Sequence, residues 1–202
     1  VPVAAMTDPQ HAGQLTPIRV LLLTQWFDPE PTFKGLQFAR SLQDRGFTVD
    51  VLTGFPNYPG GRLYPGFRVK LFQREVIEGI RVLRVPLFPS HDRSSFRRTL
   101  NYMSFAASAA VACLFIRRPD VAYIYHPPAT VAVAARMLRA VRRVPYLYDV
   151  QDLWPDTLAS TGMMTKPVLI RAVTSLVRWA YRGASRVVVL SHGFKSALLT
   201  RG

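Results

Sequence analysis

The sequence predicts an α/β fold in which helices cover both faces of a parallel β-sheet. Short apolar runs of five or six residues alternate along the chain with longer segments whose apolar residues recur at helical spacing. Several of the short runs are apolar almost throughout, as in strands that are buried on both faces. With 202 residues, of which 49% are hydrophobic, the chain can bury the core of one such domain.

The amino-terminal part contains a β-α-β unit and then a long loop. Residues 19–24 and 48–53 are the expected strands, and residues 36–47 between them place apolar side chains at helical spacing. Residues 55–67 contain three prolines and three glycines, which predicts a loop rather than a regular element. Loops of this length are usually functional.

The rest of the chain continues the alternation. Further strands are expected at residues 80–85, 121–126, 146–150 and 186–191, and further helices at residues 97–116, 129–143, 168–182 and from 194 onward. Parallel neighbours joined by right-handed crossovers form a Rossmann-like sheet sandwiched by helices, which binds ligands at the carboxyl ends of its strands. We expect residues 1–17 to be a loose leader and residues 18–202 to be the domain.

The charge of the chain predicts an anionic partner. The 26 Lys and Arg residues outnumber the 12 Asp and Glu residues, so the formal net charge is +14. Nucleic acid is not the expected partner, because the sequence has no helix-turn-helix, RNP-type or zinc-finger pattern that would position bases. The single cysteine, Cys113, excludes an internal disulfide framework and fits a reducing compartment.

The helix expected at residues 97–116 has two interpretations. Its nearly uncharged stretch is fifteen residues long, from Tyr102 to Ile116. That is too short to span a hydrocarbon core, which needs about 20 residues. The helix either packs on the sheet, or it lies in a membrane interface through Tyr102, Phe105 and Leu114. In the second case the residues that bind anionic headgroups are Arg97, Arg98, Arg117 and Arg118.

Two loops at the expected ligand edge carry candidate binding residues. Gly35 opens a helix whose free N–H groups favour a phosphate, and Lys34 adds positive charge there. Gly35 has the alternative interpretation of a tight turn. Asn57 and Tyr58 combine an amide with an aromatic face, which suits a sugar, although Tyr58 could also pack as core.

Asp152 is the candidate catalytic residue. It follows a buried strand directly, so its carboxylate is expected to point into the cleft and to orient or deprotonate a hydroxyl group. Asp156 is better explained as an acid in the first turn of a helix, and Asp149 as a buried partner of an arginine. The four histidines show no spacing of metal ligands, so we expect no metal site.

Four co-linear motifs carry a resemblance to known enzymes. They are Glu30-Pro-Thr-Phe-Lys-Gly35, Leu52-Thr-Gly-Phe-Pro-Asn-Tyr-Pro-Gly-Gly61, Tyr64-Pro-Gly66 and Asp152-Leu-Trp-Pro-Asp156. In these motifs the chain resembles the amino-terminal domain of family 4 glycosyltransferases. It is most similar to the bacterial WbuB-like enzymes of cell-surface polysaccharide synthesis, and the similarity runs from about Ile18 to the end of the sequence.

The resemblance implies one half of a GT-B enzyme, in which two Rossmann-like domains face each other across a cleft. Such enzymes transfer a sugar with retention from a nucleotide-sugar to an acceptor hydroxyl and require no cofactor and no divalent metal. The amino-terminal domain holds mostly the acceptor. The carboxy-terminal, donor-binding domain has an E-x7-E signature, which this sequence lacks. We therefore expect that domain to be absent and the chain alone to be inactive.

The resemblance also implies roles for individual residues. Asp152 would be catalytic, Lys34 and Gly35 would lie near the donor phosphate, and the acceptor would contact Asn57, Tyr58, Gln151 and Trp154. His126 is a further candidate contact because it ends a strand, although a histidine at a strand end before two prolines is more often structural. The sequence departs from the pattern at Gln151, where many relatives have His or Arg, and at His192, where relatives often have Glu. A charged role at Gln151 is therefore in doubt.

The expected acceptor is a lipid-linked glycan, which would place the protein in the cytoplasm, at the inner face of the plasma membrane. The arginines and the apolar helix motivate this expectation. The alternative is a non-catalytic glycolipid-binding domain, truncated or stand-alone, that acts with a separate donor-domain protein.

Overall fold

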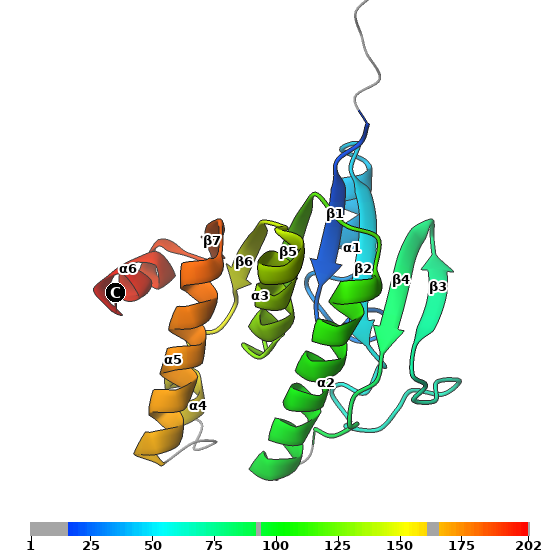
Figure 1. Ribbon diagram of the computed structural model, residues 1–202. Helices are drawn as coiled ribbons and strands as arrows, with labels where there is room; N and C mark the ends of the chain where they lie inside the picture. Colours follow the sequence, from blue (N-terminus) through cyan, green and yellow to red (C-terminus); the bar gives the residue numbers. More distant parts are fainter. Residues whose placement is uncertain (1–15, 92–93, 161–165, 202) are drawn as a thin grey trace, which may run out of the picture.

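The computed structural model describes residues 16–91, 94–160 and 166–201, and most of the expected leader lies outside them (Figure 1). The strands are Arg19–Leu23 (β1), Thr48–Gly54 (β2), Gln73–Ile77 (β3), Ile80–Val85 (β4), Val121–Tyr125 (β5), Tyr146–Val150 (β6) and Arg186–Val189 (β7). The helices are Leu36–Gln43 (α1), Ser95–Phe115 (α2), Val131–Arg142 (α3), Asp156–Ser160 (α4), Pro167–Gly183 (α5) and His192–Arg201 (α6).

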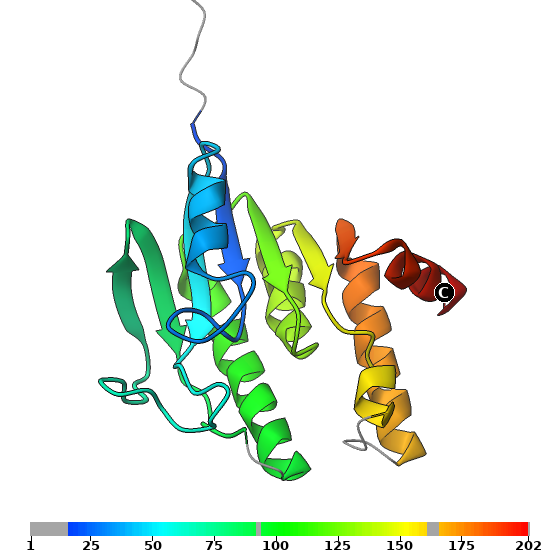
Figure 2. The ribbon, with the colours of Figure 1, turned by 180° about the vertical axis from the view of Figure 1, so that it is seen from behind.

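The strands form one sheet in the order β3-β4-β2-β1-β5-β6-β7. All neighbouring pairs are parallel except β3 and β4. Helices α2, α3 and α5 cover one face of the sheet (Figure 1), and α1 covers the other (Figure 2). The predicted Rossmann-like α/β sandwich is therefore confirmed, and the predicted strands and helices differ from the observed ones mainly at their ends.

The sheet is apolar on both faces because both faces are covered. Leu21 and Leu23 of β1 pack in a core cluster with Phe105 of α2, whereas Leu22 packs with Ala39 of α1. Successive side chains of a strand point to opposite faces, which explains why the run from Leu21 to Leu23 is apolar throughout. The fully buried Phe105 is part of this core.

Strand β3 was not predicted. It pairs antiparallel with β4 through the two-residue turn Glu78-Gly79, where both residues have positive φ (48° and 81°). A turn of this kind matches the twist of a hairpin, so the two residues could have indicated it. The sequence of β3 contains Arg74 and Glu75, which are common on an edge strand that borders solvent.

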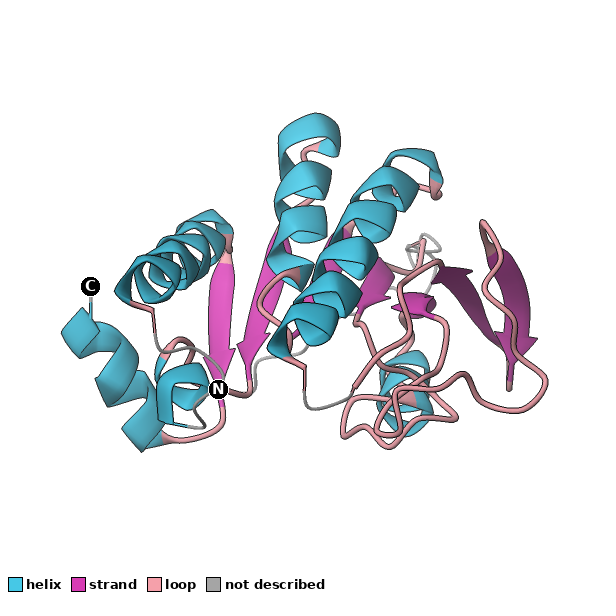
Figure 3. Ribbon diagram, turned by 90° about the horizontal axis from the view of Figure 1, so that it is seen from below, coloured by secondary structure: helices cyan, strands magenta, loops and turns pink. Residues whose placement is uncertain are grey.

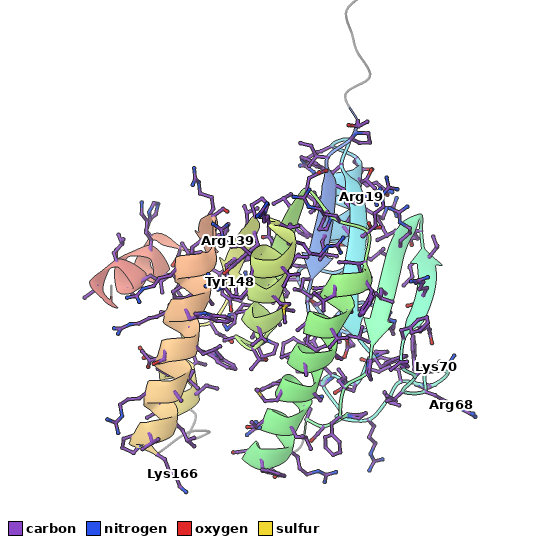
Figure 4. The ribbon with its side chains drawn as sticks, viewed as in Figure 1. Arg19, Arg68, Lys70, Arg139, Tyr148 and Lys166 are labelled. Atoms are coloured by element: carbon purple, nitrogen blue, oxygen red, sulfur yellow. The ribbon has the colours of Figure 1, made fainter. Side chains whose placement is uncertain are left out.

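On the face that α2, α3 and α5 cover, aromatic side chains join the helices to the sheet. Tyr148 of β6 lies between α3 and α5 (Figure 4). Its hydroxyl donates to the Ala129 carbonyl at 3.5 Å, and its ring lies 5.7 Å from that of Tyr181 on α5. Seen from below, the loops that follow the parallel strands gather at one edge of the sheet (Figure 3). The candidate site lies at this carboxyl edge.

Candidate functional site

One carboxylate joins the loop after β1 to the loop after β2. Glu30 is 3% exposed, and its Oε1 accepts hydrogen bonds from the backbone N–H groups of Asn57 (2.7 Å) and Tyr58 (2.8 Å). Its Oε2 accepts a third from Phe27 N–H at 3.1 Å. Burial raises the pKa of Glu30 from 4.5 to about 7, although these bonds and the charge of Arg84 lower it. Glu30 thus fixes the two loops relative to each other.

Arg84 of β4 also contacts both the loop after β1 and the end of β2. Its side chain is fully buried, and its Nε donates to Oε1 of Glu75 at 2.5 Å. Its other nitrogens donate to the carbonyls of Gly54 (3.2 Å) and Asp28 (2.5 Å). A buried arginine needs such partners, since an unpaired buried charge is costly. Arg84 therefore positions the ends of β1 and β2.

A buried amide network lies behind the second loop. Gln25 Nε2 donates to Asn101 Oδ1 at 2.6 Å, and Asn101 Nδ2 donates to Asn57 Oδ1 at 3.2 Å and to the Phe88 carbonyl at 2.7 Å. Asn57 Nδ2 donates to the carbonyl of Phe55 at 2.9 Å. Asn57 is therefore buried and bonded at both ends of its amide. At 1% exposure, its amide is not open to an acceptor in this conformation.

Aromatic side chains form the rim of this loop. The ring of Tyr58 stacks on that of Trp26, with centroids 4.5 Å apart, and meets the His91 ring edge-on at 4.7 Å. The Tyr64 hydroxyl donates to the carbonyl of Tyr58 at 2.9 Å, which holds the turn. Aromatic faces of this kind can pack against a sugar ring. The structure places Tyr58, but not Asn57, at the rim.

A second aromatic cluster follows β5 and β6. Trp154 is buried, and its ring lies 5.4 Å from that of His126 and 6.3 Å from that of Tyr102. Burial lowers the pKa of His126 to about 3, so this histidine is neutral at neutral pH. Within the described residues, His126 Nδ1 has no hydrogen-bond partner. His126 and Trp154 thus lie together, as a mainly apolar wall.

Asp152 lies beside this wall, and its carboxylate forms no hydrogen bond with a described side chain. It is half-buried, burial raises its pKa, and among the described residues no side chain bonds to it. Burial also raises the pKa of Tyr102; Arg98 lowers it, and Tyr58 and Asp152 raise it further. Tyr102 is therefore near both Asp152 and Tyr58. The fold thus brings the candidate base, Asp152, near the aromatic rim at Tyr58, although 94 positions separate the two residues in the sequence.

Gln151 is turned toward the sheet rather than into open space. Its Nε2 donates to Oδ1 of Asp149 at 2.6 Å, and the Tyr123 hydroxyl donates to the other carboxylate oxygen at 2.6 Å. The expectation that Asp149 is the partner of an arginine was wrong, because a hydroxyl and an amide satisfy its carboxylate. Gln151 therefore holds the turn that presents Asp152.

Lys34 and Gly35 lie at the start of α1. Asp28 Oδ2 accepts the N–H of Leu36 at 2.7 Å, and a Cβ on Gly35 would come within 2.3 Å of that oxygen. Glycine is thus required there by the close carboxylate. Lys34 Nζ lies 4.5 Å from the centre of the Phe38 ring. An anion that approached this helix end would meet the carboxylate of Asp28.

The membrane-facing residues expected on α2 divide between its two faces. Phe105 packs against the sheet, so the expectation that it contacts a membrane was wrong. Arg97 lies over the ring of Phe88 at 5.8 Å, and Arg118 donates to the Arg142 carbonyl at 3.1 Å. In the described part of the chain, no helix is long and apolar enough to cross a membrane. Likewise, the residues described contain no metal-binding group of three or more His, Cys, Asp or Glu.

Sequence reasoning missed the residues that hold the site together. Glu30 stood within one of the quoted motifs, yet its backbone partners are 27 and 28 positions away. Asn101 interrupts the apolar face of α2, and a lone amide on such a face could have indicated a buried polar contact. Arg84 lies on β4 on the same face as the buried Ile80 and Val82, and that alternation could have indicated a buried arginine.

Comparison with solved structures shows a related fold. Sucrose-phosphate synthase from Thermosynechococcus elongatus is similar over 91% of this chain, with a TM-score of 0.56 and 14% sequence identity. This chain spans 45% of the length of that protein. The likeness shows that the fold is that of one half of a GT-B glycosyltransferase.

Comparison with curated proteins found no significant match. The sequence profile of the family described as "Glycosyl transferase 4-like domain" matches residues 36–202, which include β2, the second loop and the Asp152 turn. The aligned region covers most of the chain and every element of the sheet except β1. The chain therefore belongs to the glycosyl transferase 4-like family.

Proposed function

We propose that this chain is the acceptor-binding domain of a retaining glycosyltransferase, which moves a sugar from a nucleotide-sugar to an acceptor hydroxyl. The observation that carries the proposal is that α2 joins the two parts of the site: Asn101 donates to Asn57, next to Tyr58, and the Tyr102 ring lies 6.3 Å from that of Trp154, two residues after Asp152. A carboxylate without a bonded partner, next to aromatic faces, can orient a sugar hydroxyl and accept its proton. Membership of the family supports glycosyl transfer in general.

The proposal assigns a role to each part of the cleft. The acceptor sugar packs against the rim formed by Tyr58 and against the wall that contains His126 and Trp154. Gln151 holds Asp152 in place through Asp149. Lys34 and Gly35 border the donor phosphate, and most donor contacts come from another domain. The reaction uses no resident cofactor and no metal ion.

The proposed acceptor is a lipid-linked glycan of bacterial cell-surface polysaccharide synthesis, reached from the cytoplasmic face of the membrane. Phe96 and Leu100, on the first turns of α2, are exposed apolar side chains at the end of the helix that borders the cleft. The surrounding charge is positive, since residues 94–118 contain four arginines and no acid. An amphiphilic acceptor with an anionic linkage fits such a surface.

The test is sugar transfer by a protein that joins this chain to a donor-binding domain. We predict that Asp152→Asn lowers turnover at least a hundredfold, the usual range for loss of a general base being about 10²–10⁴. Because burial raises the pKa of Asp152, activity should rise with pH through a pKa above the ordinary value of 3.8.

Asp156→Asn is the matched control. This carboxylate lies in the first turn of α4, four residues from Asp152 and exposed, so its loss should change turnover less than threefold. Unchanged turnover in Asp152→Asn would remove this residue from the mechanism. If the joined protein bound the acceptor but transferred no sugar in any variant, the result would favour a binding domain that works with a separate donor-domain protein.

A further inference from the structure

Two polar atoms beside the aromatic rim, Arg98 Nε and the Ser90 hydroxyl oxygen, have no hydrogen-bond partner among the described residues. Arg98 lies on the first turn of α2, and its Nε is buried without a hydrogen-bond partner among the described residues. No carboxylate in the described part of the chain forms an ion pair with it. The hydroxyl of Ser90, which is 4% exposed, also has no partner there. Buried groups of this kind are usually satisfied, so their common location calls for a ligand.

Close contacts place these groups in one cluster with the acceptor rim. The His91 ring meets the Tyr58 ring edge-on at 4.7 Å. A Cβ on Gly61 would lie 2.3 Å from the backbone nitrogen of His91, so the loops after β2 and β4 touch. Asn101 on α2 donates to the carbonyl of Phe88, which ties the same loop to the helix. Ser90 and His91 therefore lie between the rim and the start of α2.

The positive charge of Arg98 influences the pKa of two residues in this cluster, His91 and Tyr102. Burial lowers the pKa of His91, and Arg98 lowers it further, so His91 adds no second positive charge at neutral pH. Burial raises the pKa of Tyr102, and Arg98 is the largest influence that opposes it. The guanidinium thus lies near both rings.

We propose that Arg98 binds a phosphate group of the acceptor, in a subsite that Ser90, His91 and Tyr102 complete. A guanidinium presents paired N–H donors that match two phosphate oxygens, and the hydroxyls of Ser90 and Tyr102 supply further donors. The amino-terminal end of α2 adds a favourable dipole. The inference rests on the proposed function, and it gives Arg98 a ligand in the cleft rather than a lipid headgroup on the outer surface.

Binding to the 202-residue chain tests this subsite without any sugar transfer. The probes are hexyl diphosphate, inorganic pyrophosphate and the neutral hexyl glucoside, each titrated by calorimetry. We expect Arg98→Gln to weaken hexyl diphosphate at least tenfold and Arg98→Lys to retain part of the affinity. Hexyl glucoside should bind both proteins equally. Arg171→Gln is the matched control, since Arg171 is exposed near the start of α5 and its loss removes the same charge.

Two results would overturn the proposal: equal weakening by Arg98→Gln and Arg171→Gln, which indicates general charge attraction, or no weakening by Arg98→Gln. Thermal unfolding of each variant separates loss of binding from loss of fold. If inorganic pyrophosphate binds more weakly than hexyl diphosphate, the ligand of this subsite is a lipid-linked phosphate. If the two bind equally, the subsite binds free phosphate. Because Asp152 is not involved, failure here leaves the transfer test intact.

Discussion

Glu30, which joins the loops after β1 and β2, makes the stability of the fold depend on pH. Three backbone N–H groups favour its charged form, yet burial dominates and raises its pKa to about 7. The folded state therefore binds the proton more tightly than the unfolded state does, where the pKa is 4.5. The stability that this group contributes is complete below pH 4.5 and is lost as the pH rises toward 7.

We predict that the free energy of unfolding of the unmodified chain falls between pH 4.5 and pH 7, and that Glu30→Gln removes most of this slope. The variant should also lose about 1–3 kcal/mol, because an amide cannot accept all three N–H groups. Urea unfolding at several pH values measures both effects. Asp44→Asn, an exposed carboxylate after α1, is the control that should keep the slope. A slope as steep in Glu30→Gln as in the unmodified chain would contradict the assignment.

At the residue scale, the sequence predicts where a residue lies in the fold better than it predicts which way its side chain points. Asp152 could be placed at the carboxyl edge of the sheet because it directly follows a buried strand, and the end of a parallel strand has a known location. The direction of Asn57 could not be predicted, because Asn101, which binds its amide, is 44 residues away and on another element. Arg98 was likewise assigned to an outer surface, since sequence alone does not show which face of a helix turns toward a loop.

At the scale of elements, α2 shows why its two interpretations could not be separated from sequence. Its inner face contains Phe105 and alanines that pack on the sheet. Its outer face is also apolar, with exposed side chains at intervals of three or four residues: Phe96, Leu100, Met103, Ala107, Val111 and Leu114. A helix that is apolar on both faces has a weak periodic signal. One face therefore meets the expectation of a core helix, and none of the described residues covers the other.

A groove continues this outer face toward the sheet edge. It has a volume of about 710 Å³ and lies between α2 and β4, with Leu71, Phe72 and Val111 among its lining residues. Arg68 and Lys70 extend from the loop that precedes β3 (Figure 4). Apolar side chains next to exposed cations are typical of surfaces that lie on anionic membranes.

We predict that the chain binds vesicles that contain phosphatidylglycerol and that Phe96→Ser with Leu100→Ser weakens this binding at least fivefold. The serines remove apolar area that would enter the interface, at roughly 25 cal/mol per Å². Co-sedimentation at low salt measures the effect. Val141→Ser, an exposed position on α3, is the control. Equal binding to neutral phosphatidylcholine vesicles, or full binding by the double variant, would exclude this orientation of α2.

At the scale of the whole molecule, the alternation of elements predicted the sheet, whereas the antiparallel edge was missed. Parallel strands that are buried on both faces give strong apolar runs. Strand β3 is half-exposed and carries charges, so its sequence resembles that of the loop before it. Its pairing rests on the turn at Glu78 and Gly79, the one local signal for this strand, and on the contact of Glu75 with Arg84, nine positions further along the chain.

The distribution of charge over the molecule also leads to a prediction about the donor. Among the described residues, Lys34 and the start of α1 are the proposed contact for the donor phosphate, yet Asp28 already accepts the N–H of Leu36. That carboxylate repels a pyrophosphate, so the chain by itself should hold a nucleotide-sugar weakly. We expect UDP-glucose, as a representative donor, to bind with a Kd of about 1 mM or weaker, which corresponds to about −4 kcal/mol.

Titration of UDP-glucose into the 202-residue chain, followed by calorimetry or by the change in tryptophan fluorescence, measures this affinity. Lys34→Gln should change the Kd less than threefold, because the lysine already lies over the Phe38 ring and adds charge beside an opposing carboxylate. The chain should also transfer sugar far more slowly by itself than when it is joined to a donor-binding domain, since at donor concentrations below the Kd most of the protein has no donor bound. A micromolar Kd that Lys34→Gln abolishes would instead show that this domain holds the donor without help from a second one.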